Sequence, residues 1–448
     1  MKKNDFIELT IDDLGTDGQG IGHAGELAVF VDGALPGETV RAKVIALKKN
    51  YAVGKLDEIL ASSPMRVNPR CRVFGKCGGC TLQHLSYAAQ LQFKQSYVQG
   101  CIQRIGKLDI PVNFPLPARH EYRYRNKAAF PVQQNGGQVE VGFYAAHSHR
   151  IVDVDDCKIE PSNIKIVMSQ LRVWIVKNQI PIYDEKTHTG LLRHIVLREN
   201  KAGEIMLVLC INGEDIPSRS HLIMLFEFVL PQVKSIVLNC NTKQTNAILG
   251  ERSICIYGKD HLFETIGGLE FKIGPQTFLQ VNSAQTEALY NTLFRMLGLG
   301  PADSVLDLYC GAGTISLAAA QRVKKVVGIE IVKEAVDDAK FNATLNGIGN
   351  AEFFAGDTAA LLPSVLEREC ISAVIVDPPR KGLDESVVRM LASSGVPKIG
   401  YVSCNPSTMA RDLALFAELG YNAGMIQPVD MFPQTTHVEC VASLTKTE

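Results

Sequence analysis

The sequence lacks several features that would place the protein in a specialised class. Its longest apolar stretch, HLIMLFEFVL, is too short to cross a membrane and contains Glu227. Glycine and proline occur at ordinary frequencies and no segment is repeated, which excludes fibrous and disordered classes. The opening residues, MKKNDFIELTIDD, contain no apolar signal segment, so we expect a cytoplasmic protein with no membrane partner.

The sequence also has almost no net charge, which at first argues against a nucleic-acid partner. The formal net charge is -1, but residues 61–127 contain eleven lysines and arginines and only two acidic residues. A local basic face of this kind is what a phosphate backbone requires, whatever the total charge. A solvated basic loop would give the same pattern, so charge alone leaves RNA binding open.

At 448 residues the chain is long enough for about three domains. We place them at residues 1–60, 61–262 and 263–448. In the first, short alternating runs between glycine-rich turns predict about five strands and a small barrel of the oligonucleotide-binding type, although another small all-β module would fit the same periodicity. The second is a central β-rich α+β domain. It begins with a helix over about residues 84–106 that we expect to pack on the catalytic domain.

From Gln276 onward the pattern changes to strands that alternate with amphipathic helices. This alternation predicts a parallel, doubly wound α/β domain. Asn282, with Gln285 three residues later, predicts the start of a helix. The predicted strands are SVLDLYC, KVVGIEI, AEFFAG, AVIVDPP and IGYVSCN, with a terminal pair near NAGMIQPV and HVECVASL.

A glycine loop follows the first of these strands. Gly311 and Gly313 allow the backbone to approach a ligand at the carboxyl end of the strand, and Glu330 lies at the offset of a carboxylate that binds a ribose diol. A dinucleotide site is the competing interpretation. Ser316 stands where the third glycine of that fingerprint would be, which favours a different nucleotide-like cofactor.

Two further strands end in chemically active side chains that should share this crevice. Asp377 begins the turn DPPRKG, which is related to a turn in methyltransferases that act on exocyclic amines. Those enzymes have an aromatic residue where this chain has Arg380, so amine methylation is the second candidate. The next strand delivers Cys404. A cysteine at a buried strand end usually fills space in the core and has no chemical role. A thiolate there could instead add to carbon 6 of uracil and activate carbon 5 for methylation.

This addition leaves a proton on carbon 5 that a base must remove. Glu439, in the closing segment QTTHVECVASL, is the candidate because the last hairpin of such a sheet lies beside the strand that carries Cys404. An ordinary carboxylate at a strand end would give the same sequence pattern.

A second group of cysteines has the spacing of metal ligands. Cys71, Cys77 and Cys80 form a C-x5-C-x2-C pattern in a glycine-rich loop, and Cys157 is the best source of a fourth ligand. Zinc and a 4Fe-4S cluster both accept four thiolates, and the spacing does not decide between them.

These motifs together resemble the bacterial 23S ribosomal RNA uracil-5-methyltransferases over nearly the full chain. DGQGIGH resembles their TRAM domain, and FLQVN, LDLYCGAGTISL, GIEIV, VDPPRKG, SCNP and HVE match their catalytic domain in order. The resemblance implies Cys404 as nucleophile, Glu439 as base, and a 4Fe-4S cluster on Cys71, Cys77, Cys80 and Cys157. It also implies S-adenosylmethionine contacts from Gln280, Tyr309, Gly311, Gly313, Glu330, Asp357 and Asp377.

The resemblance further implies the substrate. The target base would be flipped out of an RNA loop in 23S ribosomal RNA and methylated at carbon 5 by a monomeric enzyme. Bacterial relatives that act on transfer RNA mostly lack the TRAM and cluster modules, whereas some archaeal ones have them, so transfer RNA is the alternative substrate. A non-enzymatic RNA-binding protein with a degenerate cofactor fold is the alternative outside catalysis.

Overall fold

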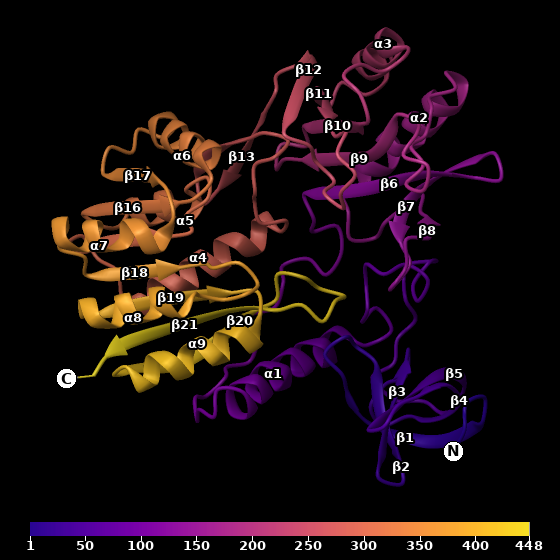
Figure 1. Ribbon diagram of the computed structural model, residues 1–448, viewed down its shortest axis with the longest axis horizontal. Helices are drawn as coiled ribbons and strands as arrows, with labels where there is room; N and C mark the ends of the chain where they lie inside the picture. Colours follow the sequence, from indigo (N-terminus) through magenta and orange to yellow (C-terminus); the bar gives the residue numbers. More distant parts are fainter. Residues whose placement is uncertain (448) are drawn as a thin grey trace.

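The structure is a computed structural model that describes residues 1–447. Figure 1 shows a small barrel near the N-terminus, a central sheet with two helices, and a C-terminal sheet with helices on both faces. No helix in the described residues is both long and apolar enough to span a bilayer.

The N-terminal barrel confirms the predicted five-stranded module. Its strands close in the order β1-β2-β3-β5-β4, and β1 pairs back with β4. Alternate side chains such as Val29 and Val31 are buried inside, as the period of two along a strand requires. Gly22 permits the close pairing of β1 and β2, because a Cβ there would lie 2.3 Å from the carbonyl oxygen of Thr10. The strands are β1 (Phe6–Leu14), β2 (Gly20–Ala24), β3 (Leu27–Asp32), β4 (Thr39–Leu47) and β5 (Tyr51–Ala61).

A loop rich in cysteine and glycine connects the barrel to helix α1 (Tyr87–Arg104). This helix lies against α9 (Pro406–Glu418) and β20 (Tyr421–Val429) of the C-terminal domain, as Figure 1 shows. Its buried face contributes Val98, Cys101 and Ile102 to the core on that side of the sheet. The helix therefore belongs to the catalytic body by packing, although it precedes the central sheet in the chain.

The central sheet has seven strands in the order β12-β11-β10-β9-β6-β7-β8. The sequence analysis expected a β-rich domain here but did not place the two helices that cover one face, α2 (Ser162–Lys177) and α3 (Arg219–Val229). Trp174 of α2 and Phe226 of α3 are buried in the core against the sheet. The strands are β6 (Lys127–Asn135), β7 (Gln138–Tyr144), β8 (Ile151–Asp153), β9 (Leu192–Glu199), β10 (Ile205–Ile211), β11 (Val233–Cys240) and β12 (Arg252–Gly258).

The C-terminal sheet has the predicted α/β character, with five parallel strands and an antiparallel pair at one edge. Its order is β17-β16-β15-β18-β19-β21-β20. Apolar residues fill both faces, with α7, α8 and α9 on one side and α4, α5 and α6 on the other. Its strands are β15 (Ser304–Leu308), β16 (Lys325–Glu330), β17 (Ala351–Ala355), β18 (Ala373–Val376), β19 (Lys398–Ser403), β20 (Tyr421–Val429) and β21 (Glu439–Lys446).

A short hairpin leads into this sheet from the central sheet. It consists of β13 (Leu262–Ile266) and β14 (Leu269–Ile273), which pair with each other. The side chain of Asn282 accepts a hydrogen bond from the backbone N–H of Gln285, which confirms the predicted helix start. The helices of this region are α4 (Ser283–Leu297), α5 (Thr314–Ala320), α6 (Lys333–Leu345), α7 (Thr358–Arg368), α8 (Glu385–Ser394) and α9 (Pro406–Glu418).

Candidate active site

The candidate site lies at the carboxyl edge of the five parallel strands. Because parallel strands present their carboxyl ends at the same edge, side chains that follow them meet there. The residues placed at this edge are Tyr309, Gly311 and Gly313 after β15, Glu330 at the end of β16, Asp357 after β17, Asp377 after β18 and Cys404 after β19.

The loop after β15 has an unusual backbone. Tyr309, Gly311 and Gly313 all have positive φ, at 66°, 54° and 80°. A tyrosine in this region is uncommon, and such backbones persist where the surroundings hold them. One constraint comes from Glu330, whose Oε2 accepts a hydrogen bond from the N–H of Gly311 at 3.1 Å. The Oε1 of Glu330 accepts from the N–H of Val332 at 2.9 Å, so the carboxylate is fixed at both oxygens.

Gly313 is required by close packing as well as by its backbone angle. A Cβ at this position would lie 3.1 Å from both Ala339 and Phe353. Asp357 stands at the N-terminus of α7, where its side chain accepts a hydrogen bond from the N–H of Ala360. Asp357 is exposed at the strand edge.

The sequence analysis missed Asp307, a buried carboxylate within β15. Ser316 of α5 donates a hydrogen bond to its Oδ2, while its Oδ1 has no partner in the described residues. Burial raises the pKa of Asp307 to about 7. The signal was available, because Asp307 is the one charged residue in the apolar strand SVLDLYC. Its hydrogen bond to Ser316 places its side chain on the face of the sheet that α5 covers.

Cys404 and Glu439 come together across two neighbouring strands. β19 and β21 pair antiparallel, with Ser403 opposite Cys440. The next position in this register places Cys404 beside Glu439. This arrangement is the one that the sequence analysis expected of the last hairpin.

The surroundings of this site disfavour the charged forms of its two acidic groups. Glu439 is 2% exposed and its Oε2 has no hydrogen-bond partner in the described part of the chain. Burial, followed by the charge of Asp377, raises the pKa of Glu439 well above its ordinary value. Burial also raises the pKa of Asp377 to about 6. Buried acids with perturbed pKa values in one crevice are typical of active sites.

Burial, Glu439 and Asp377 raise the pKa of the Cys404 thiol to about 11, and Arg380 acts in the opposite direction. The thiol is therefore protonated near neutral pH, and a positive charge is needed to favour the thiolate. Arg380 supplies that charge from the turn after β18.

Gln280 lies in a segment that the central sheet holds in place. Asn126 donates from its Nδ2 to the carbonyl oxygen of Gln280 at 3.0 Å. Arg198 of β9 donates to the carbonyl oxygens of Pro275 and Thr277 in the same segment. The Nδ2 of Asn282 donates to the carbonyl oxygen of Met431 at 3.1 Å, which places the end of the segment beside the loop that leads to Glu439.

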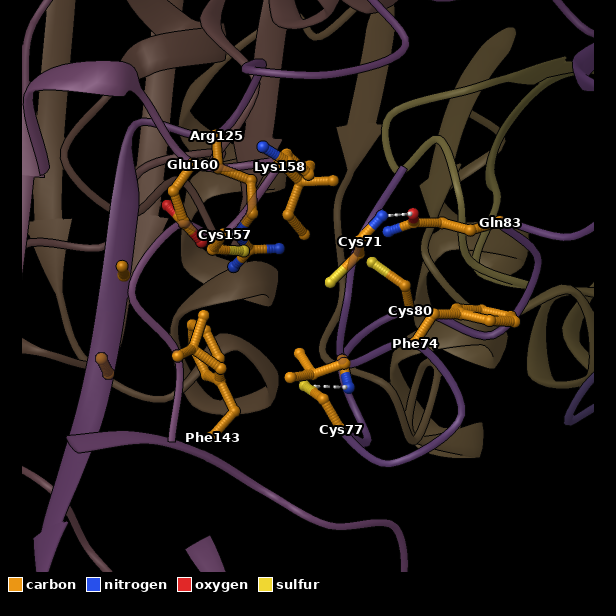
Figure 2. Close-up of a pocket in the computed structure, with 16 residues that line it drawn as sticks. Cys71, Phe74, Cys77, Cys80, Gln83, Arg125, Phe143, Cys157, Lys158 and Glu160 are labelled. Carbon is orange, nitrogen blue, oxygen red and sulfur yellow. Dashed lines mark hydrogen bonds and ion pairs between the residues drawn. The ribbon is translucent and has the colours of Figure 1, made fainter. Parts of the chain in front are cut away.

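The four predicted cysteine ligands line a single cavity between the central sheet and the cysteine-rich loop that connects the barrel to α1. Cys71, Cys77, Cys80 and Cys157 surround a space of about 260 Å³. Figure 2 shows Cys71 and Cys80 close together on one side, with Cys77 and Cys157 facing the same space from other sides. Within residues 1–447, no three His, Cys, Asp or Glu side chains converge closely enough to hold one metal ion.

The sheet and its edge define a class of protein before any comparison is made. A doubly wound sheet with a tight glycine loop after β15 and a fixed carboxylate at the end of β16 is typical of enzymes that bind a nucleotide-like cofactor at this edge, among them the S-adenosylmethionine-dependent methyltransferases. Cys404 and Glu439 lie beside this edge of the sheet.

Comparisons with known proteins identify the family. Residues 257–447 match the family described as tRNA (Uracil-5-)-methyltransferase, and residues 2–56 match the TRAM domain. Proteins described as uncharacterized RNA methyltransferases are 43% identical in Clostridium tetani, over 99% of this chain and 97% of that protein, and 44% identical in Halalkalibacterium halodurans, over 99% and 98%. The chain belongs to the RNA (uracil-5-)-methyltransferase family and is an S-adenosylmethionine-dependent enzyme that acts on RNA.

A solved structure has the same architecture. It is the Pyrococcus abyssi tRNA (uracil-54, C5)-methyltransferase in complex with S-adenosyl-L-homocysteine, which is 28% identical with a TM-score of 0.79. The match covers 98% of this chain and 99% of that one. The comparisons remove the amine-methylating and non-enzymatic alternatives, and they leave open which RNA is the substrate.

Proposed function

We propose that the enzyme methylates carbon 5 of uridine in 23S ribosomal RNA through a covalent bond between Cys404 and carbon 6 of the base. The single observation that carries the proposal is the pairing of β19 with β21, which sets a half-buried thiol beside a buried carboxyl group. A nucleophile and a base on adjacent strands are what addition and elimination at a pyrimidine ring require.

The proposed reaction assigns each residue one task. The Cys404 thiol first loses its proton to solvent, and the resulting thiolate bonds to carbon 6. The electron pair of the 5,6 double bond moves into an enolate that makes carbon 5 nucleophilic. S-adenosylmethionine, when bound, supplies an electrophilic methyl group. The Glu439 carboxylate then takes the proton from carbon 5, the double bond re-forms, and the bond from carbon 6 to sulfur breaks to return the thiolate.

The raised pKa of Glu439 suits this final step. A carboxylate whose burial disfavours the charged form is a stronger base than one in water. Asp377, which is partly buried, lies close enough to influence both Cys404 and Glu439 electrostatically.

We assign the S-adenosylmethionine contacts to the same edge of the sheet. Glu330 would accept hydrogen bonds from the ribose hydroxyls, because each of its carboxylate oxygens keeps a free lone pair after binding one backbone N–H. The glycine loop would allow close approach of the cofactor. The remaining proposed contacts are Gln280, Tyr309, Asp357 and Asp377.

We propose the three-domain division of residues 1–60, 61–262 and 263–448 as the functional organisation. The barrel and the exposed basic residues of residues 61–127, such as Arg70, Arg72 and Lys76, would hold the RNA backbone, while the catalytic domain receives a base flipped out of its stack. Lys94 of the same stretch is buried in an ion pair with Asp430 and is not available to RNA. Mapping 5-methyluridine in ribosomal and transfer RNA from a strain lacking the gene tests the substrate. Loss of a 23S site supports the proposal, and loss confined to transfer RNA contradicts it.

We further propose that Cys71, Cys77, Cys80 and Cys157 hold a 4Fe-4S cluster. All four thiols line one cavity of about 260 Å³, which has room for a group larger than a single ion. Four thiolates are also the ligand set of such a cluster.

Anaerobic purification tests this assignment. The protein should be brown and contain about four iron atoms per chain. Cys77→Ser should lose the iron, while Cys370→Ser, which alters an exposed cysteine elsewhere, should retain it. A colourless protein that contains zinc in place of iron would refute the assignment.

A further inference from the structure

The loop that delivers Glu439 is held mainly by residues from outside the catalytic sheet. It spans residues 430–438, between β20 and β21. The N–H groups of Thr81 and Leu82 both donate to the carbonyl oxygen of Gln434 at 3.0 Å. The N–H of Gln434 donates to Oε1 of Gln90, on α1, at 2.9 Å. The backbone of Gln434 is thus fixed on both sides by the segment that follows Cys80.

Gln434 adopts a backbone conformation that needs such support. Its φ is 72°, in the left-handed region that non-glycine residues rarely occupy, and the residue is 1% exposed. The side chain is also held, because its Oε1 accepts a hydrogen bond from Nε2 of Gln90 at 3.1 Å. A strained residue persists where its surroundings over-determine it, and such residues gather at functional sites.

Other contacts fix the rest of the loop from the same direction. Lys94 of α1 and Asp430 form a fully buried ion pair at 2.5 Å. Tyr124 donates from its hydroxyl to the carbonyl oxygen of Pro433 at 3.0 Å. The N–H of Thr436 donates to the hydroxyl of Thr81 at 3.2 Å.

The N-terminal barrel covers the same region. A Cβ added to Gly18, in the turn before β2, would lie 3.3 Å from the side chain of Thr436 and 3.3 Å from that of Leu82. The loop is therefore the point where the barrel, the cysteine loop and α1 meet beside the active site.

We infer that Gln434 is a positioning residue that sets the orientation of Glu439, with the segment from Thr81 to Gln90 as its support. The inference rests on the proposed function, because it assumes that Glu439 removes the proton from carbon 5. Cys404 follows β19 within the sheet, so its position does not depend on this loop. Disturbing Gln434 should therefore slow the release of product and leave the attack on carbon 6 unchanged.

Two substitutions at Gln434 distinguish the effect of its backbone conformation from the effect of losing its side chain. Gln434→Gly removes the side chain but adopts positive φ readily, whereas Gln434→Val disfavours it because the side chain branches at Cβ. Each full-length variant would be mixed with S-adenosylmethionine and in vitro transcribed 23S ribosomal RNA, or unmodified transfer RNA. Methyl transfer and the denaturation-stable adduct would be followed in a single turnover.

The valine variant should accumulate methylated adduct, with release slowed on the order of 10-fold to 100-fold, the effect expected from a small misplacement of a catalytic group. Its rate of methyl transfer should stay within about twofold of wild type, and the glycine variant should release product nearly normally. Equal behaviour of the two variants, or an equal slowing of transfer and release, would overturn the inference.

Controls separate this inference from general destabilisation and from failure of the proposed function. Asn241→Ala removes a buried amide that holds a distant loop through Ala247 and Ile248, and it should accumulate no adduct. If the valine variant fails to fold, Gln90→Ala replaces it, with the same expected accumulation. If Glu439→Gln accumulates adduct and the Gln434 and Gln90 variants do not, the positioning role alone is refuted. If Glu439→Gln itself accumulates no adduct, both proposals are refuted.

Discussion

Replacing Glu439 by glutamine should stabilise the protein while it damages catalysis. The carboxyl group is buried in the catalytic domain, and one of its oxygens has no hydrogen-bond partner in the described residues. Leaving a buried polar atom unsatisfied costs about 1–3 kcal/mol, and more when the group is charged. Glutamine has nearly the same shape and never ionises, so it removes the part of this cost that comes from charge.

The pH dependence of this gain follows from the direction of the pKa shift. Burial raises the pKa of Glu439 in the folded protein, so the folded state binds the proton more tightly than the unfolded state. Its contribution to stability is therefore fully present below the unfolded pKa of about 4.3 and is lost as pH rises towards the folded pKa. The gain in the free energy of unfolding from Glu439→Gln should accordingly be small near the unfolded pKa and largest above the folded pKa.

Calorimetric unfolding of both proteins at about pH 5 and about pH 8 measures the effect. A gain of about 2 kcal/mol in the catalytic domain corresponds to a rise in Tm of about 4–8 °C. We expect this rise at the higher pH and a smaller one at the lower pH. An unchanged Tm at the higher pH, or the same gain at both, would refute the interpretation of Glu439 as a buried, unsatisfied acid.

Three further predictions concern the reaction. Glu439→Gln should accumulate covalent adduct on normal RNA, seen as a shifted band in a denaturing gel, and free turnover by this variant would remove Glu439 from the role of base. The rate of adduct formation by the wild type should rise about tenfold per pH unit towards the raised pKa of Cys404. Arg380→Ala should move this pH profile to higher pH. A profile that does not move would contradict the role of Arg380. Glu330→Ala should weaken the binding of S-adenosylhomocysteine on the order of 10-fold in calorimetry, the loss expected when hydrogen bonds to a charged group are removed, and unchanged affinity would place the ribose elsewhere.

The sequence predicts the barrel, the doubly wound sheet and most of the strand-end residues because these features repeat with a short period. A strand that alternates at every second residue, or a glycine loop after a buried strand, is visible in a window of about ten residues. Helix α3 was missed because its apolar run is short and nearly continuous, with no clear helical period.

Long-range contacts could not be predicted in this way. Gln90 and Gln434 are 344 positions apart in the chain, yet they form a hydrogen-bonded pair beside the active site. Nothing in the local sequence of either residue indicates its partner. Asp307 stands out in the sequence as the one charged residue of an apolar strand, but its partner Ser316, nine positions later, is visible only in the structure.

The central claim is that Cys404 bonds to the uracil ring during catalysis. RNA with 5-fluorouridine at the target position tests it directly, because carbon 5 then carries no proton for Glu439 to remove. The wild-type enzyme should remain bonded to this RNA after methyl transfer, and peptide mass spectrometry should locate the bond at Cys404. Absence of a denaturation-stable adduct with the wild type, or its formation by Cys404→Ala, would contradict the mechanism.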